Sequence, residues 1–191
     1  MEYSEQKITF DIVSDSQLAI NYPQAIRDSK KLKVLSLFSG CGGMDLGFEG
    51  DFIAPFKSVA TCPEWIERRL DDDWVHLKPT NFSLVFANDI LKEAALTWTR
   101  FMKQYGYEPS IYRTESIVDL VKQHRNGGNV FPDNVDVVVG GFPCQDFSVA
   151  GKRKGFDSMR THDGKLRAGD LPTEETRGKL YYWMKEVIDI T

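Results

Sequence analysis

The sequence predicts an α/β fold in which a doubly wound, mostly parallel sheet carries helices on both of its faces. Short apolar runs alternate along the chain with longer segments of helical periodicity. Such alternation is typical of parallel sheets, because each strand returns to the same edge through a crossover helix. Three runs end in glycine-rich or polar stretches, at residues 38–43, 88–89 and 142–144. Ligands bind at the carboxyl ends of parallel strands, so these stretches indicate where a functional site lies.

Four apolar runs are predicted as strands, because they are short, rich in strand-forming residues and bounded by turn formers. In chain order they are residues 32–38, 83–87, 110–112 and 135–139. Helices are predicted to begin at Met44 and to cover residues 91–105, 116–124 and 178–190. The stretch 49–82 has no sustained period and carries the acidic triplet Asp71–Asp73. We therefore expect an irregular surface insertion there.

The predicted helices have recognisable local signals. Residues 91–105 contain good helix formers and neither glycine nor proline. Ser116 or Thr114 is placed to cap the next helix. Its apolar residues are expected to face the core, and they are Ile117, Val118, Leu120 and Val121. The last helix has apolar residues at helical spacing, namely Leu180, Trp183, Met184, Val187 and Ile188.

Composition restricts the class of protein. The chain has 191 residues, of which 41% are hydrophobic and 27% charged, as in ordinary globular domains. Residues 1–31 are predicted to form an N-terminal arm, and residues 32–191 one domain or part of a larger one. No apolar stretch approaches the about 20 residues that cross a bilayer, and no signal peptide is recognisable. Three scattered cysteines indicate a reducing, cytoplasmic location, and no Cys/His spacing of a zinc site is present, so no metal is expected.

Charge is distributed unevenly along the chain. The net charge is −4, but residues 151–170 hold six basic residues and three acidic ones. The basic residues are Lys152, Arg153, Lys154, Arg160, Lys165 and Arg167. This island is either a solvated loop or a contact surface for an anionic partner.

The stretch Phe38-Ser39-Gly40-Cys41-Gly42-Gly43 is a glycine-rich turn between a strand and a helix. Glycines allow a ligand to approach the backbone closely. The spacing departs from the dinucleotide motif G-x-G-x-x-G, and no Lys-Ser/Thr pair of a P-loop follows. An uncharged or zwitterionic nucleoside therefore fits better than a pyrophosphate, although a plain tight turn is also consistent with the pattern.

Asp89 follows the second predicted strand, where an acid in nucleotide-binding sheets accepts hydrogen bonds from ribose hydroxyls. Capping of the helix that follows is the alternative. Cys144 lies just past the fourth strand, after the rigid Pro143, and near the basic residues 152–154. Positive potential favours a thiolate. This position favours a nucleophile over an inert core cysteine.

Three ordered motifs give a resemblance to the DNA (cytosine-5)-methyltransferase family of restriction-modification systems. "LSLFSGCGGMDLGF" resembles the family's cofactor-binding F-x-G-x-G motif, and "VVVGGFPCQDFSVAGKRKGF" resembles its catalytic Pro-Cys motif. "TRGKLYYWM" resembles the motif R-G-x-L-F. The resemblance covers roughly residues 32–190, and it implies a Rossmann-like methyltransferase fold with S-adenosyl-L-methionine as the cofactor.

The resemblance also implies roles for individual residues. Cys144 corresponds to the nucleophile that adds to C6 of a flipped cytosine in double-stranded DNA. The expected cofactor contacts are Phe38, Ser39, Gly40, Cys41, Gly42, Gly43, Asp89, Ile90, Ser116, Ile117, Pro143 and Leu180. The expected DNA contacts are Gln145, Ser148, Lys152, Arg153, Lys154 and Arg160. Two positions depart from the family pattern: Ile90 stands where an aromatic is common, and Ser116 where an aspartate is usual.

Later family motifs are not found in the sequence. These are Glu-Asn-Val, whose acid protonates the cytosine ring, an arginine motif and a target-recognition domain. We therefore expect a fragment, or one subunit of a split enzyme whose partner polypeptide carries the rest. A catalytically inactive cofactor-binding or DNA-binding remnant is the alternative. An NAD-dependent oxidoreductase is disfavoured by the glycine spacing.

Overall fold

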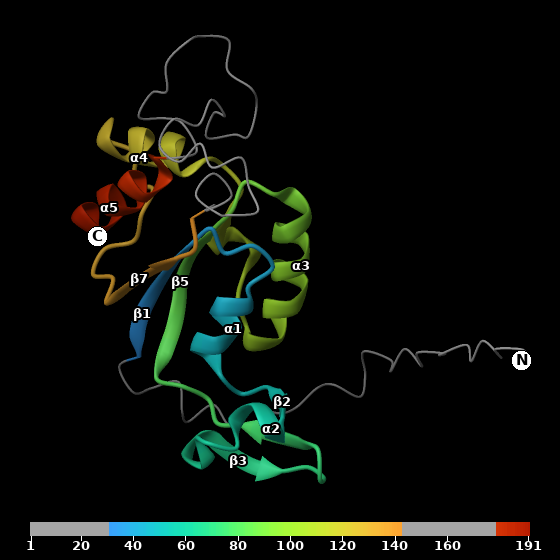
Figure 1. The fold of residues 1–191 in the computed structure, drawn as a ribbon. Coiled ribbons are helices and arrows are strands. Elements are labelled where there is room, and N and C mark those ends of the chain that lie inside the picture. The colour runs from blue at the N-terminus through green and yellow to red at the C-terminus, as the bar shows by residue number, and fades with distance from the viewer. Residues whose placement is uncertain (1–30, 143–178) are drawn as a thin grey trace, which may run out of the picture.

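The structure is a computed structural model that describes residues 31–142 and 179–191. Its central sheet has four parallel strands in the order β6-β5-β1-β7 (Figure 1). The strands are β1 (Leu32–Leu37), β5 (Phe82–Asn88), β6 (Tyr112–Arg113) and β7 (Val137–Gly140). The chain moves outward from β1 through β5 and β6 and then reverses to β7. The topological switch point, where ligands bind in such sheets, therefore lies between β1 and β7.

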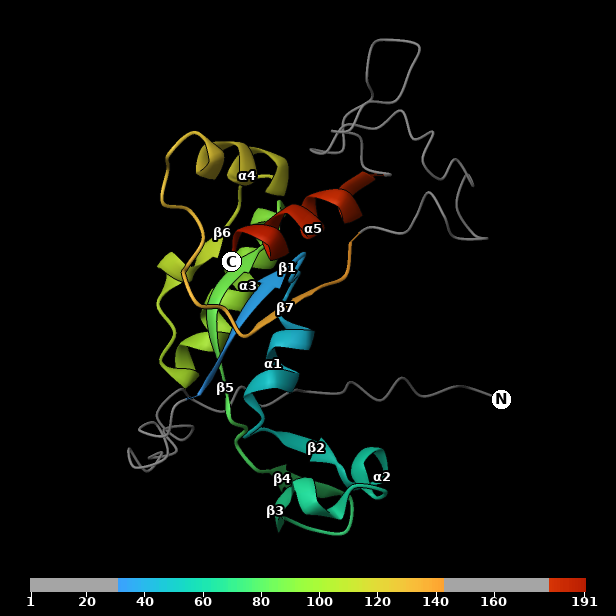
Figure 2. The same ribbon diagram turned by 90° about the vertical axis from the view of Figure 1, so that its left-hand side faces the viewer.

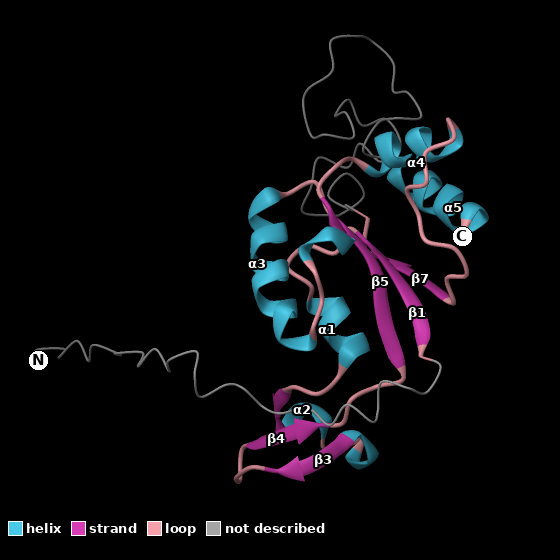
Figure 3. Cartoon of the chain, turned by 180° about the vertical axis from the view of Figure 1, so that it is seen from behind, coloured by secondary structure: helices cyan, strands magenta, loops and turns pink. Residues whose placement is uncertain are grey.

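Helices cover both faces of this sheet, as Figures 1 and 3 show. One face carries α1 (Gly43–Glu49) and α3 (Lys92–Met102), and the other carries α4 (Ile117–Arg125) and α5 (Leu180–Ile190). Side chains alternate across β1, so Val34 packs on the α3 face while Leu35 and Leu37 pack under α4 and α5. The predicted α/β fold with a doubly wound parallel sheet is confirmed.

Most predicted elements form, with bounds that shift by at most three residues. α3 continues into a 3₁₀ turn, η4 (Lys103–Tyr105). Ser116 is the residue that caps α4, because its side chain accepts from the Val118 N–H. The four apolar residues expected to face the core from α4 are all buried.

Two details of the prediction were wrong. The strand expected at 110–112 is mostly a 3₁₀ turn, η5 (Pro109–Ile111), because Pro109 lacks the N–H that a strand ladder needs. Only Tyr112 and Arg113 pair with β5. In α5, Ile188 is 52% exposed although its spacing predicted a core position. Ile190 packs against the core instead.

The stretch 49–82 is not irregular, contrary to expectation. It contains β2 (Ile53–Pro55), α2 (Phe56–Val59), η3 (Pro63–Trp65), β3 (Ile66–Arg69) and β4 (Trp74–Leu77). The three strands form a separate antiparallel sheet in the order β2-β4-β3. Strands of three or four residues are too short to establish a recognisable period, which explains the error. We call residues 50–80 the lobe; it projects from the amino-terminal end of the main sheet (Figure 2).

The lobe has its own small core. Ala54, Val59, Val75 and Leu77 are its buried apolar residues, with Phe56 and others packed at the side. Within residues 31–142 and 179–191, no helix has both the length and the apolar character that crossing a membrane requires.

Candidate cofactor site

The ends of β1, β5 and β6 are tied together around the peptide groups of Gly40. Its N–H donates to Asp89 Oδ2 at 3.1 Å, and its carbonyl accepts from the Tyr112 hydroxyl at 2.9 Å. The Ser39 N–H donates to the Asn88 carbonyl at 2.9 Å. Residues distant in sequence thus converge on the glycine-rich turn at the carboxyl edge of the sheet.

The glycine-rich turn adopts a conformation that a chain without glycine would resist. Phe38 has a φ of 55°, Gly40 of 53° and Gly42 of 90°. A Cβ added at Gly42 would lie 2.6 Å from Trp98 Cδ1, so the turn is held close to α3. A Cβ added at Gly40 would meet no atom of residues 31–142 or 179–191 within 4 Å, so among these residues open space adjoins the backbone there. A ligand can therefore approach this peptide closely.

A buried carboxylate supports the turn from below. Asp45, in the first turn of α1, is fully buried. It accepts hydrogen bonds from the Ser36 hydroxyl and, at 2.6 Å, from the Trp98 indole N–H. Ser39 donates in turn to Ser36. This network joins β1, α1 and α3 directly beneath the glycine-rich turn.

The electrostatics of the site follow from burial. Burial raises the pKa of Asp45 above its usual value, although hydrogen bonds from Ser36, Trp98 and Ser39 oppose the rise. Burial also raises the pKa of Tyr112, and the negative charges of Asp89 and Asp45 add to this effect. Tyr112 therefore remains a protonated hydroxyl that can donate to Gly40 at neutral pH.

Asp89 uses both of its oxygens within the protein. Oδ2 accepts from Gly40, and Oδ1 accepts from the Leu91 N–H at 3.0 Å. The helix α3 begins at Lys92, with Leu91 at the N-cap and no side-chain cap. Asp89 therefore fixes the loop that enters α3 without being its cap. A carboxylate has about four acceptor sites, so two contacts leave capacity for ribose hydroxyls.

The other described residues that were expected to contact the cofactor differ in how deeply they are buried. Ile90 is 40% exposed beside Asp89, whereas Ile117 and Leu180 are core residues of one cluster, exposed by 2% and 4%. Phe38 packs partly against that same cluster. Ser116 is buried at the start of α4. Of these residues, Ile90 has the most exposed surface, whereas Ser116, Ile117 and Leu180 are buried.

Several predicted site residues lie outside the described residues. They are Pro143, Cys144, Gln145, Ser148, Lys152, Arg153, Lys154 and Arg160. The last residue of β7, Gly140, pairs with Leu37 of β1. The described chain thus leads to the switch point and ends there at Phe142.

Three side chains that build the site were not predicted from the sequence, namely Asp45, Trp98 and Tyr112, and Asn88 was expected at this edge without a role of its own. Asn88 is 1% exposed, and its amide donates to the carbonyls of Arg113 and Glu115. It therefore fixes the path of the chain as it leaves β6. The sequence signals for Asn88 and Asp45 were weak: Asn88 is a polar residue at the end of a buried strand, and Asp45 is an acid two residues after the glycine-rich turn.

The fold and the site define an α/β protein in which a glycine-rich turn and the acid Asp89 meet at the carboxyl edge of a doubly wound parallel sheet. Residues 32–166 match the family model described as C-5 cytosine-specific DNA methylase, which is more than half of the chain. The chain therefore belongs to the C-5 cytosine-specific DNA methylase family, whose members have a Rossmann-like, S-adenosylmethionine-dependent fold.

Characterised relatives are consistent with this family. The chain is 35% identical to the type II methyltransferase M.BspRI of Lysinibacillus sphaericus over 127 residues, which are 65% of this chain and 26% of that protein. It is 34% identical to M.BsuRI of Bacillus subtilis over 144 residues, 74% of this chain and 29% of the relative. It is 30% identical over 126 residues to the DNA (cytosine-5-)-methyltransferase M.ApeKI of Aeropyrum pernix, 62% of this chain and 20% of that protein. The chain thus spans less than a third of each of these relatives.

Proposed function

We propose that this chain carries the cofactor-binding and nucleophile-bearing part of an enzyme that methylates C5 of cytosine in double-stranded DNA. One observation carries the proposal. The Gly40 peptide, just past the carboxyl end of β1, is bound by Asp89 and Tyr112. In the sequence, Cys144 follows the last residue of the adjacent strand β7 by only four residues. This spacing supports the proposal that a nucleophile and a nucleoside-type site share one edge of the sheet.

S-adenosyl-L-methionine, when bound, supplies an electrophilic methyl group on a positively charged sulfur. The glycine-rich turn, residues 38–43, offers backbone groups without side chains in the way, and open space adjoins Gly40. Asp89 is oriented by its two backbone contacts and has spare acceptor sites for ribose hydroxyls. Ile90 offers an exposed apolar surface for the base. Ser116, Ile117, Pro143 and Leu180 complete the proposed pocket.

Cys144 is the proposed nucleophile. Its thiolate forms a bond to C6 of a cytosine that has been turned out of the duplex. The electron pair of the C5–C6 double bond then becomes available at C5, which takes the methyl group. Loss of the C5 proton to a base and departure of the thiolate restore the double bond and the free enzyme. The covalent adduct divides one difficult substitution into easier steps.

DNA is the proposed partner of the segment after Cys144. Gln145 and Ser148 can donate and accept hydrogen bonds, and the basic island can neutralise phosphates. Lys152, Arg153, Lys154 and Arg160 are the residues we assign to this role. Binding through phosphates releases counterions, so we expect affinity for DNA to fall steeply with salt.

We propose that further family motifs act together with this chain, either in a longer polypeptide or in a second one. The matched relatives are more than three times as long as the segments they share with this chain. An acid that protonates the cytosine ring would stabilise the charge that develops on it after thiolate addition, and such stabilisation is typically the largest contribution to catalysis.

A methyl-transfer assay tests this function. Mixed-sequence DNA and labelled S-adenosylmethionine are incubated with the chain alone and with the products of neighbouring genes. We expect labelled 5-methylcytosine, at least when the complementing polypeptide is present. Cofactor binding without methyl transfer in every mixture would contradict the proposal and support an inactive cofactor-binding remnant, whereas binding of NAD alone would indicate an oxidoreductase.

A further inference from the structure

Three metal-ligating side chains from separate segments meet in the lobe, far from the cofactor site. Asp51 follows α1, Glu67 lies on β3, and His76 lies on the central strand β4. One ligand atom from each lies within 4.8 Å of the other two. His76 is 3% exposed, so its imidazole is a core group of the lobe. The proposed methylation chemistry does not use any of these residues.

The register of the small sheet brings two of these residues together. Ile66 pairs with Leu77 and Arg68 pairs with His76, so Glu67 is an extra residue in a β-bulge. Bulges re-aim side chains. Glu67 Oε2 lies 2.8 Å from His76 Nδ1, which is a good hydrogen bond.

The imidazole of His76 lies between two carboxylates, one at each nitrogen. Nδ1 contacts Glu67, and Nε2 lies 3.4 Å from Asp51 Oδ1. A carboxylate only accepts hydrogen bonds, and a neutral imidazole carries one N–H and one lone pair. If Nδ1–H donates to Glu67, the lone pair of Nε2 faces the oxygen of Asp51. A positive species, either a proton or a metal ion, must lie between these two atoms to make the contact favourable.

The 3.4 Å separation favours a metal ion over a proton. It exceeds the 2.7–3.2 Å range of N–H···O hydrogen bonds. Two ligands held at about 2.0–2.2 Å from one tetrahedral zinc ion lie about 3.4 Å apart. A ligating histidine typically donates its other N–H to a carboxylate, which is the contact that Glu67 makes.

We propose that the lobe binds one divalent cation of the zinc class between His76 Nε2 and the Asp51 carboxylate, with Glu67 accepting from Nδ1–H. Water completes the coordination. The ion joins the segment after α1 to the central strand of the lobe sheet. Its role is structural, because the lobe lies at the opposite end of the sheet from the glycine-rich turn (Figure 2).

The small size of the lobe explains why a bound ion would stabilise it. Four buried apolar residues form its core. Units of fewer than about 40 residues usually need a metal, a disulfide or a partner for stability. The positive charges of Arg68 and Lys31 act on Asp51 and oppose a bound ion, whereas the negative charge of Glu67 favours one.

Calorimetry and thermal unfolding with zinc ions test the site in the whole chain. We expect zinc to raise the Tm of the chelator-treated protein, because an ion that binds only the folded state stabilises it. Asp51→Asn should weaken zinc binding at least tenfold, because it removes the ligand charge. Asn tolerates the positive φ of 56° at this position, so the variant keeps the local backbone.

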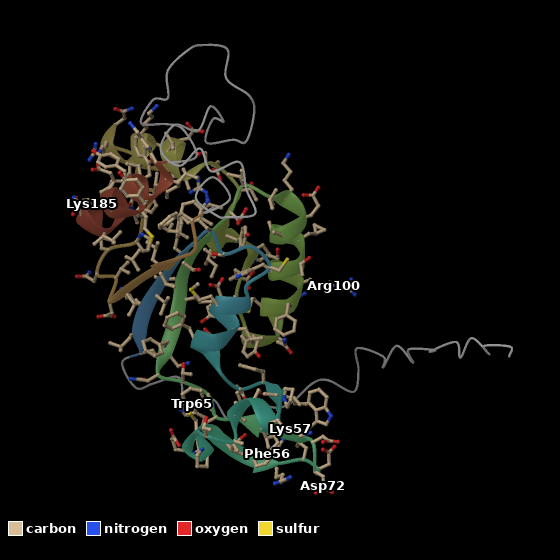
Figure 4. All side chains as sticks on the ribbon, in the orientation of Figure 1. Phe56, Lys57, Trp65, Asp72, Arg100 and Lys185 are labelled. Carbon is tan, nitrogen blue, oxygen red and sulfur yellow. The ribbon has the colours of Figure 1, made fainter. Side chains whose placement is uncertain are left out.

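A matched control lies on the same lobe. Asp72 is at its outer tip (Figure 4) and fully exposed, so Asp72→Asn should leave zinc binding unchanged. Glu67→Ala should weaken binding by about 10- to 100-fold, as loss of such an outer contact does. An equal zinc response in all variants would place the ion elsewhere and overturn the proposal. A Tm that depends on pH but not on zinc would overturn it too, because a proton would then occupy the position.

Discussion

Asp45 shows how one buried residue supports the cofactor site. Its carboxylate accepts from Ser36 and Trp98, and Trp98 in turn limits the space at Gly42. Loss of this carboxylate would leave two buried donors without their acceptor, which typically costs about 1–3 kcal/mol for each unsatisfied group. The glycine-rich turn therefore depends on a side chain that is itself fully buried.

The titration of Asp45 predicts a pH effect on stability. Burial raises its folded-state pKa above the ordinary 3.8, so between these two values the folded state binds more protons than the unfolded state. The contribution of Asp45 to the free energy of unfolding therefore falls as pH rises through this window. Asp45→Asn removes that contribution while it keeps an acceptor for Trp98. Urea unfolding from roughly pH 4 to 8 should give a less negative slope for the variant. Identical slopes for both proteins would show that Asp45 does not titrate abnormally.

Gly42 provides a second test at this scale. Gly42→Ala would place a Cβ 2.6 Å from Trp98 and strain a φ of 90°. We expect a loss of about 1–3 kcal/mol in the free energy of unfolding, measured by urea denaturation. Gly47→Ala is the control, because it lies in α1 with open space around it. That change should stabilise the protein by up to about 1 kcal/mol. Equal effects of the two changes would contradict the packing argument.

Asp89 tests the cofactor assignment. A hydrogen bond to a charged group contributes about 1.5–3 kcal/mol, so Asp89→Asn should weaken S-adenosylmethionine binding by roughly 10- to 150-fold. The amide oxygen can still accept from Gly40, which keeps the turn in place. Glu93→Gln removes the same charge from the exposed first turn of α3 and should leave the affinity unchanged. Isothermal titration calorimetry measures the S-adenosylmethionine affinity of both variants and of the unchanged protein. Equal affinities for all three proteins would remove Asp89 from the ribose site.

At the scale of elements, α4 and α5 are joined by an ion pair between Arg125 and Glu186. Glu186 is 5% exposed, so it needs this partner, while Arg125 remains largely in solvent. Arg125→Ala should therefore cost about 1–2 kcal/mol, between the values for exposed and fully buried pairs. In the double variant with Glu186→Gln, the neutral amide no longer needs the cation. We expect a smaller cost from Arg125→Ala in that background. Additive costs in urea unfolding would show that the pair is not coupled.

Elements with strong periodic patterns were predictable, and those defined by tertiary pairing were not. α4 carries a cap and an apolar face that can be read from sequence, and both are present. β6 consists of two residues that pair only because β5 lies beside them. The strands of the lobe are likewise specified by their pairing with one another and by a small common core. The local pattern of apolar and polar residues does not show which strands pair with one another.

At the scale of the whole molecule, the doubly wound sheet could be predicted from the alternation of strands and helices along the sequence. The contacts of Gly40 with Asp89 and Tyr112 bring the ends of β1, β5 and β6 together at its carboxyl edge, and the functional roles of residues there stay a prediction. The roles of Tyr112, Asn88 and Trp98 were not predictable, because they depend on which strand ends become neighbours in space. The triad of the lobe was hidden for the same reason, since its three residues come from separate segments.

The most direct test of the central claim is covalent trapping on DNA that contains 5-fluorocytosine. Fluorine at C5 cannot leave as a proton does, so the adduct through Cys144 should persist and be visible on a denaturing gel. We predict an adduct with the wild-type chain, supplied with the remaining family motifs, and with Cys62→Ser, which changes a cysteine of the lobe. Cys144→Ser should give none. An adduct that forms equally well with Cys144→Ser would contradict the account.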